Sequence, residues 1–194
     1  MDTVIACKYD NGTLMAVETT VNRSIFKMKF NEDKTFKLGD RCLMVLAGDI
    51  ADRAHFGSFI QRNIDFNRFK NNGRQSSVRS SAEFVRGELA KAIRESQKQV
   101  SPIIIGYDER KQAQLYWLDY LGTIAEVNHA SQGYCSYFVS SILNHEWRNN
   151  LKLEEAVKLL ERCANQVKGR IIIDQLNFDY WVVDKDGIRK LNKE

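Results

Sequence analysis

The sequence of 194 residues contains no long hydrophobic run, because no stretch approaches 18 uninterrupted apolar residues. A membrane-spanning helix needs about 20 such residues, so we expect no membrane partner. The N-terminus also lacks the basic, apolar and small-residue pattern of a secretory signal. We see no linker, internal repeat or low-complexity segment, and therefore expect a single domain over residues 1–194.

Cysteine and histidine are scarce and scattered. The four cysteines are Cys7, Cys42, Cys135 and Cys163, and the three histidines are His55, His129 and His145. No Cys-x-x-Cys is present, and no histidine has a second ligand at metal-binding spacing. We therefore expect buried free thiols in a reducing compartment, with neither a metal site nor a cofactor.

No charge of one sign dominates: 29 basic and 25 acidic residues give a net charge of +4, which is mild for a nucleic-acid-binding protein. One local excess of basic residues has a single acidic neighbour, Asp65, and two interleaved phenylalanines, Phe66 and Phe69. Its members are Arg62, Arg68, Lys70, Arg74 and Arg79. We interpret this segment as a solvated helix end whose phenylalanines point into the core. The alternative is a phosphate-binding and base-stacking surface.

The chain begins with two β-prone stretches, residues 3–9 and 13–19, which flank Asn11-Gly12 and predict a hairpin. Further strands are expected over 24–29, 35–38 and 42–47. A helix is then expected over 49–70, capped by acidic residues at its start. Its predicted apolar face consists of Phe56, Phe59, Ile60 and Ile64.

A second helix should begin at Ser80, with Glu83 completing a capping box. Its predicted buried stripe is Val85, Leu89 and Ile93. Strands over 103–105, 115–118 and 123–127 lead to a second pair of helices. These helices are expected over 133–147, with Phe138 and Ile142 inward, and over 153–167, with Ala156, Leu160, Cys163 and Val167 inward.

Two final strands, over 178–183 and 188–191, should form a hairpin at Asp186-Gly187. Strand blocks therefore alternate with pairs of helices along the chain. Most strands are joined by hairpins rather than by single crossover helices, which favours antiparallel sheets covered by helices. The predicted fold class is α+β.

Several segments, in order along the chain, resemble one known family. After the first hairpin come Leu43–Gly48 with the acidic helix start Asp49–Asp52, then Asp119–Thr123, then Asp184–Ile188. Together these segments resemble the β-type subunits of the 20S proteasome and span nearly the whole chain. The Met1-Asp2 start is most similar to a non-catalytic paralogue of the eukaryotic ring. The resemblance implies the four-layer αββα sandwich of N-terminal nucleophile hydrolases.

In active members of that family, an N-terminal threonine supplies the nucleophilic hydroxyl, and its own free amine is the base. The aligned position here is Asp2. Thr3 follows it, but its amide nitrogen cannot accept a proton at neutral pH. The resemblance further places Lys34 at the family's lysine and Glu18 at its first aspartate, with one extra methylene.

The remaining positions of the family's catalytic group have also changed. Tyr134 stands where the family has a serine, Ile171 stands where it has a second aspartate, and Asp174 replaces another serine. We therefore expect a vestigial site, Asp2, Glu18, Lys34, Tyr134 and Ile171, with no catalytic residue. Lys34 and Glu18 would remain as a buried ion pair.

The resemblance implies a non-catalytic structural subunit of the core particle that degrades intracellular, ubiquitin-targeted proteins. Its partners would be other α and β subunits in an α7β7β7α7 barrel, with regulatory caps contacted indirectly, in cytoplasm and nucleus. Two alternatives remain: an active N-terminal threonine peptidase subunit with an unrecognised start, and a basic α/β protein that binds nucleic acid. Steep salt dependence of binding would indicate the second.

Overall fold

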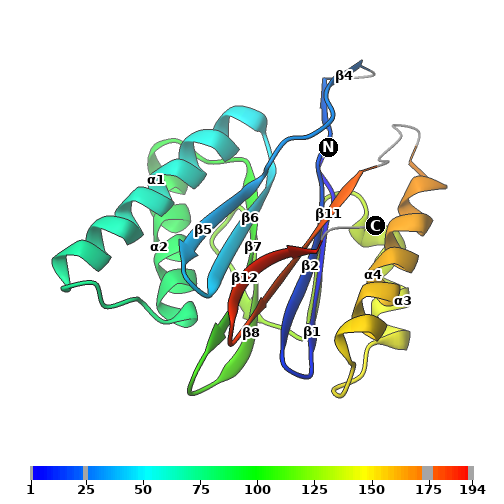
Figure 1. Ribbon diagram of the computed structural model, residues 1–194. Coiled ribbons are helices and arrows are strands. Elements are labelled where there is room, and N and C mark those ends of the chain that lie inside the picture. The colour runs from blue at the N-terminus through cyan, green and yellow to red at the C-terminus, as the bar shows by residue number, and fades with distance from the viewer. Residues whose placement is uncertain (1, 24–25, 172–176, 192–194) are drawn as a thin grey trace.

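The structure, a computed structural model, describes residues 2–23, 26–171 and 177–191. Two sheets stack face to face in the centre of the molecule, and a pair of helices covers each outer face (Figure 1). The order of layers is α1 and α2, the sheet that contains β5 to β9, the sheet that contains β1 and β2, then α3 and α4. The predicted αββα sandwich is confirmed.

The sheet next to α3 and α4 has five antiparallel strands in the order β10-β1-β2-β11-β12. Their bounds are β1 Val4–Tyr9, β2 Gly12–Glu18, β10 His129–Gln132, β11 Phe178–Asp184 and β12 Gly187–Leu191. The predicted first hairpin is confirmed, since β1 pairs with β2 from Val4 opposite Val17 to Tyr9 opposite Gly12. The closing hairpin also forms.

The sheet next to α1 and α2 runs in the order β5-β6-β7-β8-β9, again antiparallel. Its strands are β5 Thr35–Gly39, β6 Cys42–Gly48, β7 Val100–Asp108, β8 Gln112–Leu118 and β9 Ile124–Glu126. A separate two-stranded ribbon consists of β3 Val21–Arg23 and β4 Phe26–Lys29. These two strands follow β2 and precede β5 along the chain. Strands β3 and β10 were not anticipated from the sequence.

The described part of the chain forms four helices, α1 Ile50–Lys70, α2 Val78–Glu95, α3 Ser136–Glu146 and α4 Leu153–Lys168. Asp49 caps α1 as expected, because its side chain accepts hydrogen bonds from the N–H groups of Ala51 and Asp52. The apolar face predicted for the last helix is confirmed in α4, where Ala156, Leu160, Cys163 and Val167 are buried.

Several predictions about the helices were wrong in detail. Helix α2 begins one turn earlier than expected, and its cap is Ser77, whose hydroxyl accepts from the Ser80 N–H at 3.1 Å. Phe59 and Ile93, both expected inside, are 47% and 41% exposed. Helix α3 starts three residues later than expected, and its fully buried positions are Val139 and Leu143. Ile142 packs against the core as predicted but is only partly buried, and Phe138 is half-buried.

Side chains alternate between the two faces of each strand, so the two sheets contribute to three apolar layers, one between the sheets and one under each pair of helices. In β1, Val4 and Ala6 point between the sheets, whereas Ile5 and Cys7 point toward α3 and α4. Successive strand side chains face opposite sides of a sheet, so strands that are covered on both faces are apolar throughout. All four cysteines are buried and unpaired, as expected. Within the described residues, no helix is long and apolar enough to cross a membrane.

Candidate functional site

The side chains of Asp2, Glu18 and Lys34 meet at one end of the sandwich, where the two sheets come together. Asp2 precedes β1 and Glu18 ends β2, so both belong to the first sheet. Lys34 directly precedes β5 of the second sheet. The structure thus joins three of the five site positions that the resemblance singled out.

Lys34 is fully buried, and it uses all of its donors within the chain. Its Nζ donates to Asp2 Oδ1 at 2.7 Å, to Glu18 Oε2 at 3.1 Å and to the Thr20 carbonyl oxygen at 2.7 Å. An ammonium group has three N–H donors. Lys34 therefore has no donor left for an added group while Asp2 remains in place.

The second oxygen of Asp2 is held from the other side. Arg53 Nη1 donates to Asp2 Oδ2 at 2.7 Å, and the Gly48 N–H donates to the same oxygen at 3.1 Å. Arg53 is a core residue of α1, only 4% exposed. It was missed at the level of sequence, although its place three and four residues before the buried Phe56 and Gly57 marks the same helix face.

Asp2 and Glu18 face the same lysine, but their pKa values move in opposite directions. Burial favours a raised pKa for Asp2, yet the positive charges of Lys34 and Arg53 outweigh it and hold the pKa below its ordinary value. Burial dominates for Glu18 and raises its pKa, and the Lys34 charge opposes this only in part. The nearby Asp2 charge raises it further. Lys34 and Arg53 thus stabilise mainly the Asp2 carboxylate.

Tyr134 lies in the turn between β10 and α3, next to the cluster but not joined to it. A Cβ added to the preceding Gly133 would lie 1.9 Å from the Asp2 carbonyl oxygen, so this turn passes against the backbone of residue 2. The Tyr134 side chain itself is 58% exposed. Its assignment as the replacement of a family serine stays a prediction.

Ile171 lies in a different environment. It is half-buried and packs against the core between the first sheet and the helices α3 and α4. It therefore contributes an apolar side chain to packing and no charge to the Lys34 cluster. Asp174, expected at another family position, lies outside the described residues.

The basic segment that ends α1 differs from expectation. Phe66 and Phe69 are 54% and 82% exposed, so the prediction that they point into the core was wrong. The Lys70 ammonium lies 4.4 Å from the centre of the Phe66 ring, and Arg68 pairs with Asp40. These cations already have partners within the chain, which weakens the case for a phosphate-binding surface.

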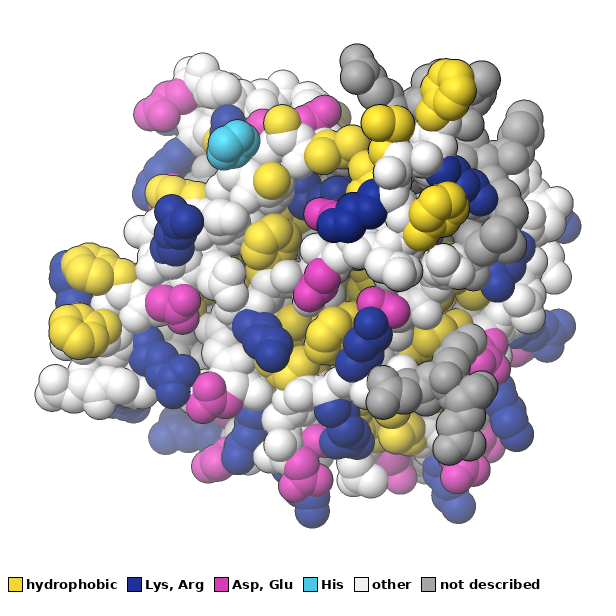
Figure 2. All heavy atoms as spheres, turned by 45° about the horizontal axis from the view of Figure 1, so that its top comes forward, with side chains coloured by type: hydrophobic (Ala, Val, Ile, Leu, Met, Phe, Trp, Pro, Cys, Tyr) yellow, Lys and Arg dark blue, Asp and Glu magenta, His cyan; other side chains and the backbone are white. Residues whose placement is uncertain are grey.

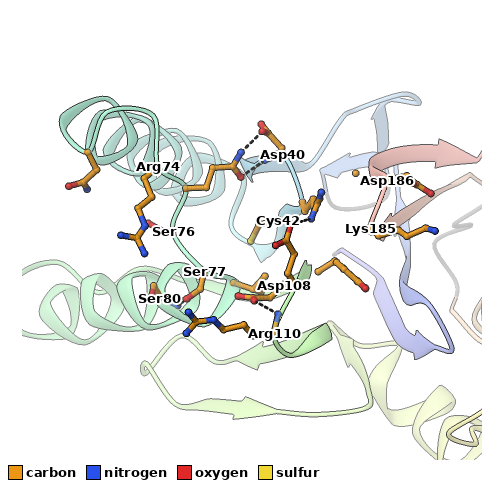
Figure 3. Close-up of a pocket in the computed structure, with 17 residues that line it drawn as sticks. Asp40, Cys42, Arg74, Ser76, Ser77, Ser80, Asp108, Arg110, Lys185 and Asp186 are labelled. Carbon is orange, nitrogen blue, oxygen red and sulfur yellow. Dashed lines mark hydrogen bonds and ion pairs between the residues drawn. The ribbon is translucent and has the colours of Figure 1, made fainter.

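A large pocket lies far from the Lys34 cluster, at the opposite end of the β5–β6 hairpin. It has a volume of about 1160 Å³ and is lined by the β5–β6 turn, the start of α2 and the β7–β8 and β11–β12 turns (Figure 3). Its charges are of both signs, and Arg41 pairs with Glu109 across part of it. Residues 2–23, 26–171 and 177–191 contain no group of three or more metal-ligating side chains.

The exposed surface carries many large apolar side chains. Figure 2 shows them at several places on one face, between charges of both signs. Among the residues that the structure describes, those more than half exposed are Phe26, Met28, Phe30, Phe66, Phe69, Tyr134 and Tyr137. Large exposed apolar side chains in such number are typical of surfaces that contact other proteins.

Comparison with known proteins agrees with this geometry. The model of the proteasome subunit family matches residues 1–183. Proteasome subunit beta type-2-A of Arabidopsis thaliana is 33% identical over 189 residues, which cover 97% of this chain and 92% of that protein. Proteasome subunit beta type-2 of Oryza sativa is 35% identical over 190 residues, or 98% and 89% of the two chains.

A third relative, proteasome subunit beta type-4 of Saccharomyces cerevisiae, is 34% identical over 194 residues, which cover 99% of this chain and 98% of the relative. Two of these three relatives carry the type-2 name, and all three match almost end to end. The chain belongs to the proteasome subunit family, as one of its β-type subunits.

Proposed function

We propose that this chain is a catalytically inactive β subunit of the 20S core particle, which forms part of the wall of the ring and supports active neighbours. The observation that carries the proposal is the buried, ion-paired carboxylate of Asp2, the residue that the family resemblance aligns with the nucleophile. A carboxylate bound by Lys34, Arg53 and the Gly48 N–H is held in its ionised form by two cations. It offers neither a hydroxyl nor a free amine to a peptide bond.

The donor groups around residue 2 already hydrogen-bond to that carboxylate. In an amine-activated threonine peptidase, a lysine lowers the pKa of the amine, and a backbone N–H near the nucleophile stabilises the oxyanion. Here Lys34 and the Gly48 N–H both donate to Asp2. A substrate oxyanion would have to displace an ion-paired carboxylate before it could use either group.

The second candidate function, an active threonine peptidase, finds less support. Thr3 is buried, 1% exposed, and is flanked by the peptide bond that joins it to Asp2. A peptide nitrogen cannot act as the base, and a hydroxyl sealed in the core cannot reach a polypeptide substrate. Tyr134, next to the cluster, and Ile171, which packs in the core against α3 and α4, supply no carboxylate or small hydroxyl.

Membership of the proteasome subunit family supports assembly with other proteasome subunits. The proposed arrangement is two copies of this chain in an α7β7β7α7 barrel in the cytoplasm and nucleus, with regulatory caps contacted through other subunits. Exposed apolar side chains such as Phe69 and Tyr137 would then be covered by neighbours. This assembly gives the exposed phenylalanines of α1 a role that needs no nucleic acid.

The test uses intact core particles purified through an affinity tag on this chain and treated with a threonine-directed epoxyketone. We expect the active β subunits of the same particle to be labelled, which provides an internal control, and this chain to stay unmodified in intact-mass spectra. Native mass spectrometry of the particle should show 28 chains, on the order of 600 kDa if each resembles this 22.4 kDa chain. A stoichiometric adduct on this chain would overturn the proposal.

A further inference from the structure

Three donors converge on the two oxygens of the Asp2 carboxylate. Lys34 Nζ lies 2.7 Å from Oδ1, Arg53 Nη1 lies 2.7 Å from Oδ2, and the Gly48 nitrogen lies 3.1 Å from Oδ2. The two shorter distances are typical of charge-assisted hydrogen bonds. Each carboxylate oxygen thus has a buried cation of its own.

All three donors belong to the part of the molecule around the second sheet, while Asp2 comes from the first. Lys34 precedes β5, Gly48 ends β6 and Arg53 lies in the first turns of α1. The backbone of each donor residue is therefore placed by elements that do not include residue 2. Removing the Asp2 side chain would leave them facing an empty space of carboxylate size.

Gly48 is held firmly in position by its neighbours. Its φ of +145° favours glycine, and an added Cβ would lie 2.0 Å from the Gln99 carbonyl oxygen. The next residue, Asp49, donates its N–H to that same oxygen at 2.9 Å. Gly48 itself is exposed, so this end of the pocket lies close to the molecular surface.

The charges require an anion at this place. Lys34 and Arg53 carry two buried positive charges, and Asp2 and Glu18 supply two negative ones. Without Asp2, one positive charge would remain buried and uncompensated, which is strongly unfavourable. A neutral side chain at position 2 cannot replace that charge.

We propose that Lys34, Arg53 and the Gly48 N–H form an anion-binding pocket for a single carboxylate, which Asp2 occupies as a tethered ligand. When the Asp2 side chain is removed, the pocket binds a free small carboxylate such as formate. The inference concerns the same site as the proposed function. The two share one premise, which is that residue 2 is an aspartate rather than a threonine.

The geometry selects a monovalent carboxylate over larger anions. Two oxygens are bound from opposite sides, by Lys34 on one and by Arg53 with Gly48 on the other. A tetrahedral dianion such as sulfate would bring two negative charges to a net charge of +1 and would place further oxygens near Glu18. Formate has the shape and charge of the group that Asp2 supplies.

The test follows exchange of the Gly48 amide with deuterium, resolved to single residues, in core particles that contain the Asp2→Gly variant. Loss of the carboxylate should speed this exchange about tenfold, because a hydrogen bond to a charged group contributes roughly 1.5 kcal/mol or more. Added formate should restore protection in a saturable manner. Chloride and sulfate at equal ionic strength should not.

The matched control is Asp2→Asn, whose side chain fills the same space without charge. Its Gly48 exchange should not respond to formate, which separates binding in the pocket from a general effect of the ion. Asp2→Gly particles that assemble but show no formate dependence would overturn the inference. Labelling of this chain by an epoxyketone in wild-type particles would instead contradict the proposed function and leave the exchange result unaffected.

Arg53→Met offers a second route if Asp2→Gly does not assemble. With Asp2 intact, loss of one of its two cations should speed exchange at Gly48 by several-fold, because the carboxylate is held less firmly against the N–H. Unchanged exchange in this variant would contradict the inference.

Discussion

Asp2 and Lys34, 32 positions apart in the sequence, form a buried ion pair with 2.7 Å between Oδ1 and Nζ. This pair joins the start of the first sheet to the start of β5 in the second. Arg53 extends it into α1. The end of the sandwich that holds Asp2, Glu18 and Lys34 is therefore closed by a buried charge network that links the two sheets and α1.

The two carboxylates of this network should respond differently to neutralisation. Asp2→Asn is expected to cost about 3 kcal/mol in the free energy of unfolding, because it leaves Lys34 and Arg53 with one carboxylate between them. Glu18→Gln should cost less than about 1 kcal/mol, since the raised pKa of Glu18 shows that its charge is poorly favoured in the fold. Urea unfolding of the full chain measures both, and equal losses would contradict the assignment.

The pH dependence of stability should reveal the titration of both Asp2 and Glu18. The pKa of Asp2 is lowered in the folded chain. The stability that the Asp2 carboxylate contributes is therefore present above its ordinary pKa of 3.8 and is lost as the pH falls below that value. The raised pKa of Glu18 has the opposite sign, so stability should rise as the pH falls toward the ordinary value of 4.5 and Glu18 regains its proton. Urea midpoints across this range should show a rise that Glu18→Gln abolishes and a fall that Asp2→Asn abolishes.

Replacement of Asp2 by threonine behind a cleavable propeptide should not create a peptidase. The change restores a hydroxyl and an amine but leaves Arg53 without its partner, and neither Tyr134 nor Ile171 supplies the missing groups. Loss of one electrostatic partner commonly costs about 10² to 10³ in rate. We expect neither propeptide cleavage nor peptide hydrolysis in particles whose native sites are silenced. Activity within about tenfold of a native site would show that the alignment at Tyr134 or Ile171 is wrong.

Two glycine-to-alanine substitutions should change the stability of the chain in opposite directions. Gly133 has a φ of +88°, and its added Cβ would meet the Asp2 carbonyl oxygen at 1.9 Å, so Gly133→Ala should destabilise the chain by about 2 kcal/mol or more. Gly87 lies inside α2, and apart from its chain neighbours and the backbone of its own helix no atom lies within 4 Å of its added Cβ. Gly87→Ala should therefore stabilise by about 0.5–1 kcal/mol. Unfolding midpoints of the two variants, compared with wild type, measure both effects. A higher midpoint for Gly133→Ala or a lower one for Gly87→Ala would contradict the prediction.

The exposed end of α1 should matter for assembly rather than for folding. Phe69 is 82% exposed, so Phe69→Ser should change the unfolding free energy of the chain by less than about 0.5 kcal/mol. If neighbours cover this side chain, the variant should be more soluble alone and should enter core particles less efficiently in competition with wild type. Phe56→Ser, at a 6% exposed position of the same helix, is the control that should lose stability instead.

The sequence by itself determined the order and type of most elements. The strands around Asn11-Gly12 and Asp186-Gly187 could be recognised because turn residues and strand periodicity act locally. Helix α4 was read correctly because only one of its faces is apolar. The aspartate at position 2 and the lysine at position 34 were also visible, and the family resemblance connected them.

Only the tertiary structure decided which apolar faces are covered and which charges meet. Helix α1 has apolar residues on two faces, and periodicity cannot tell that Phe56 is covered while Phe59 and Phe69 are exposed. Strand β10 is short, and its place beside β1 comes from long-range pairing rather than from local preference. Arg53 reaches Asp2 across 51 positions of sequence because β6 and α1 carry it there. The direction of the Gly48 N–H depends on the neighbouring strand, so the closure of this site by its own carboxylate could be found only in three dimensions.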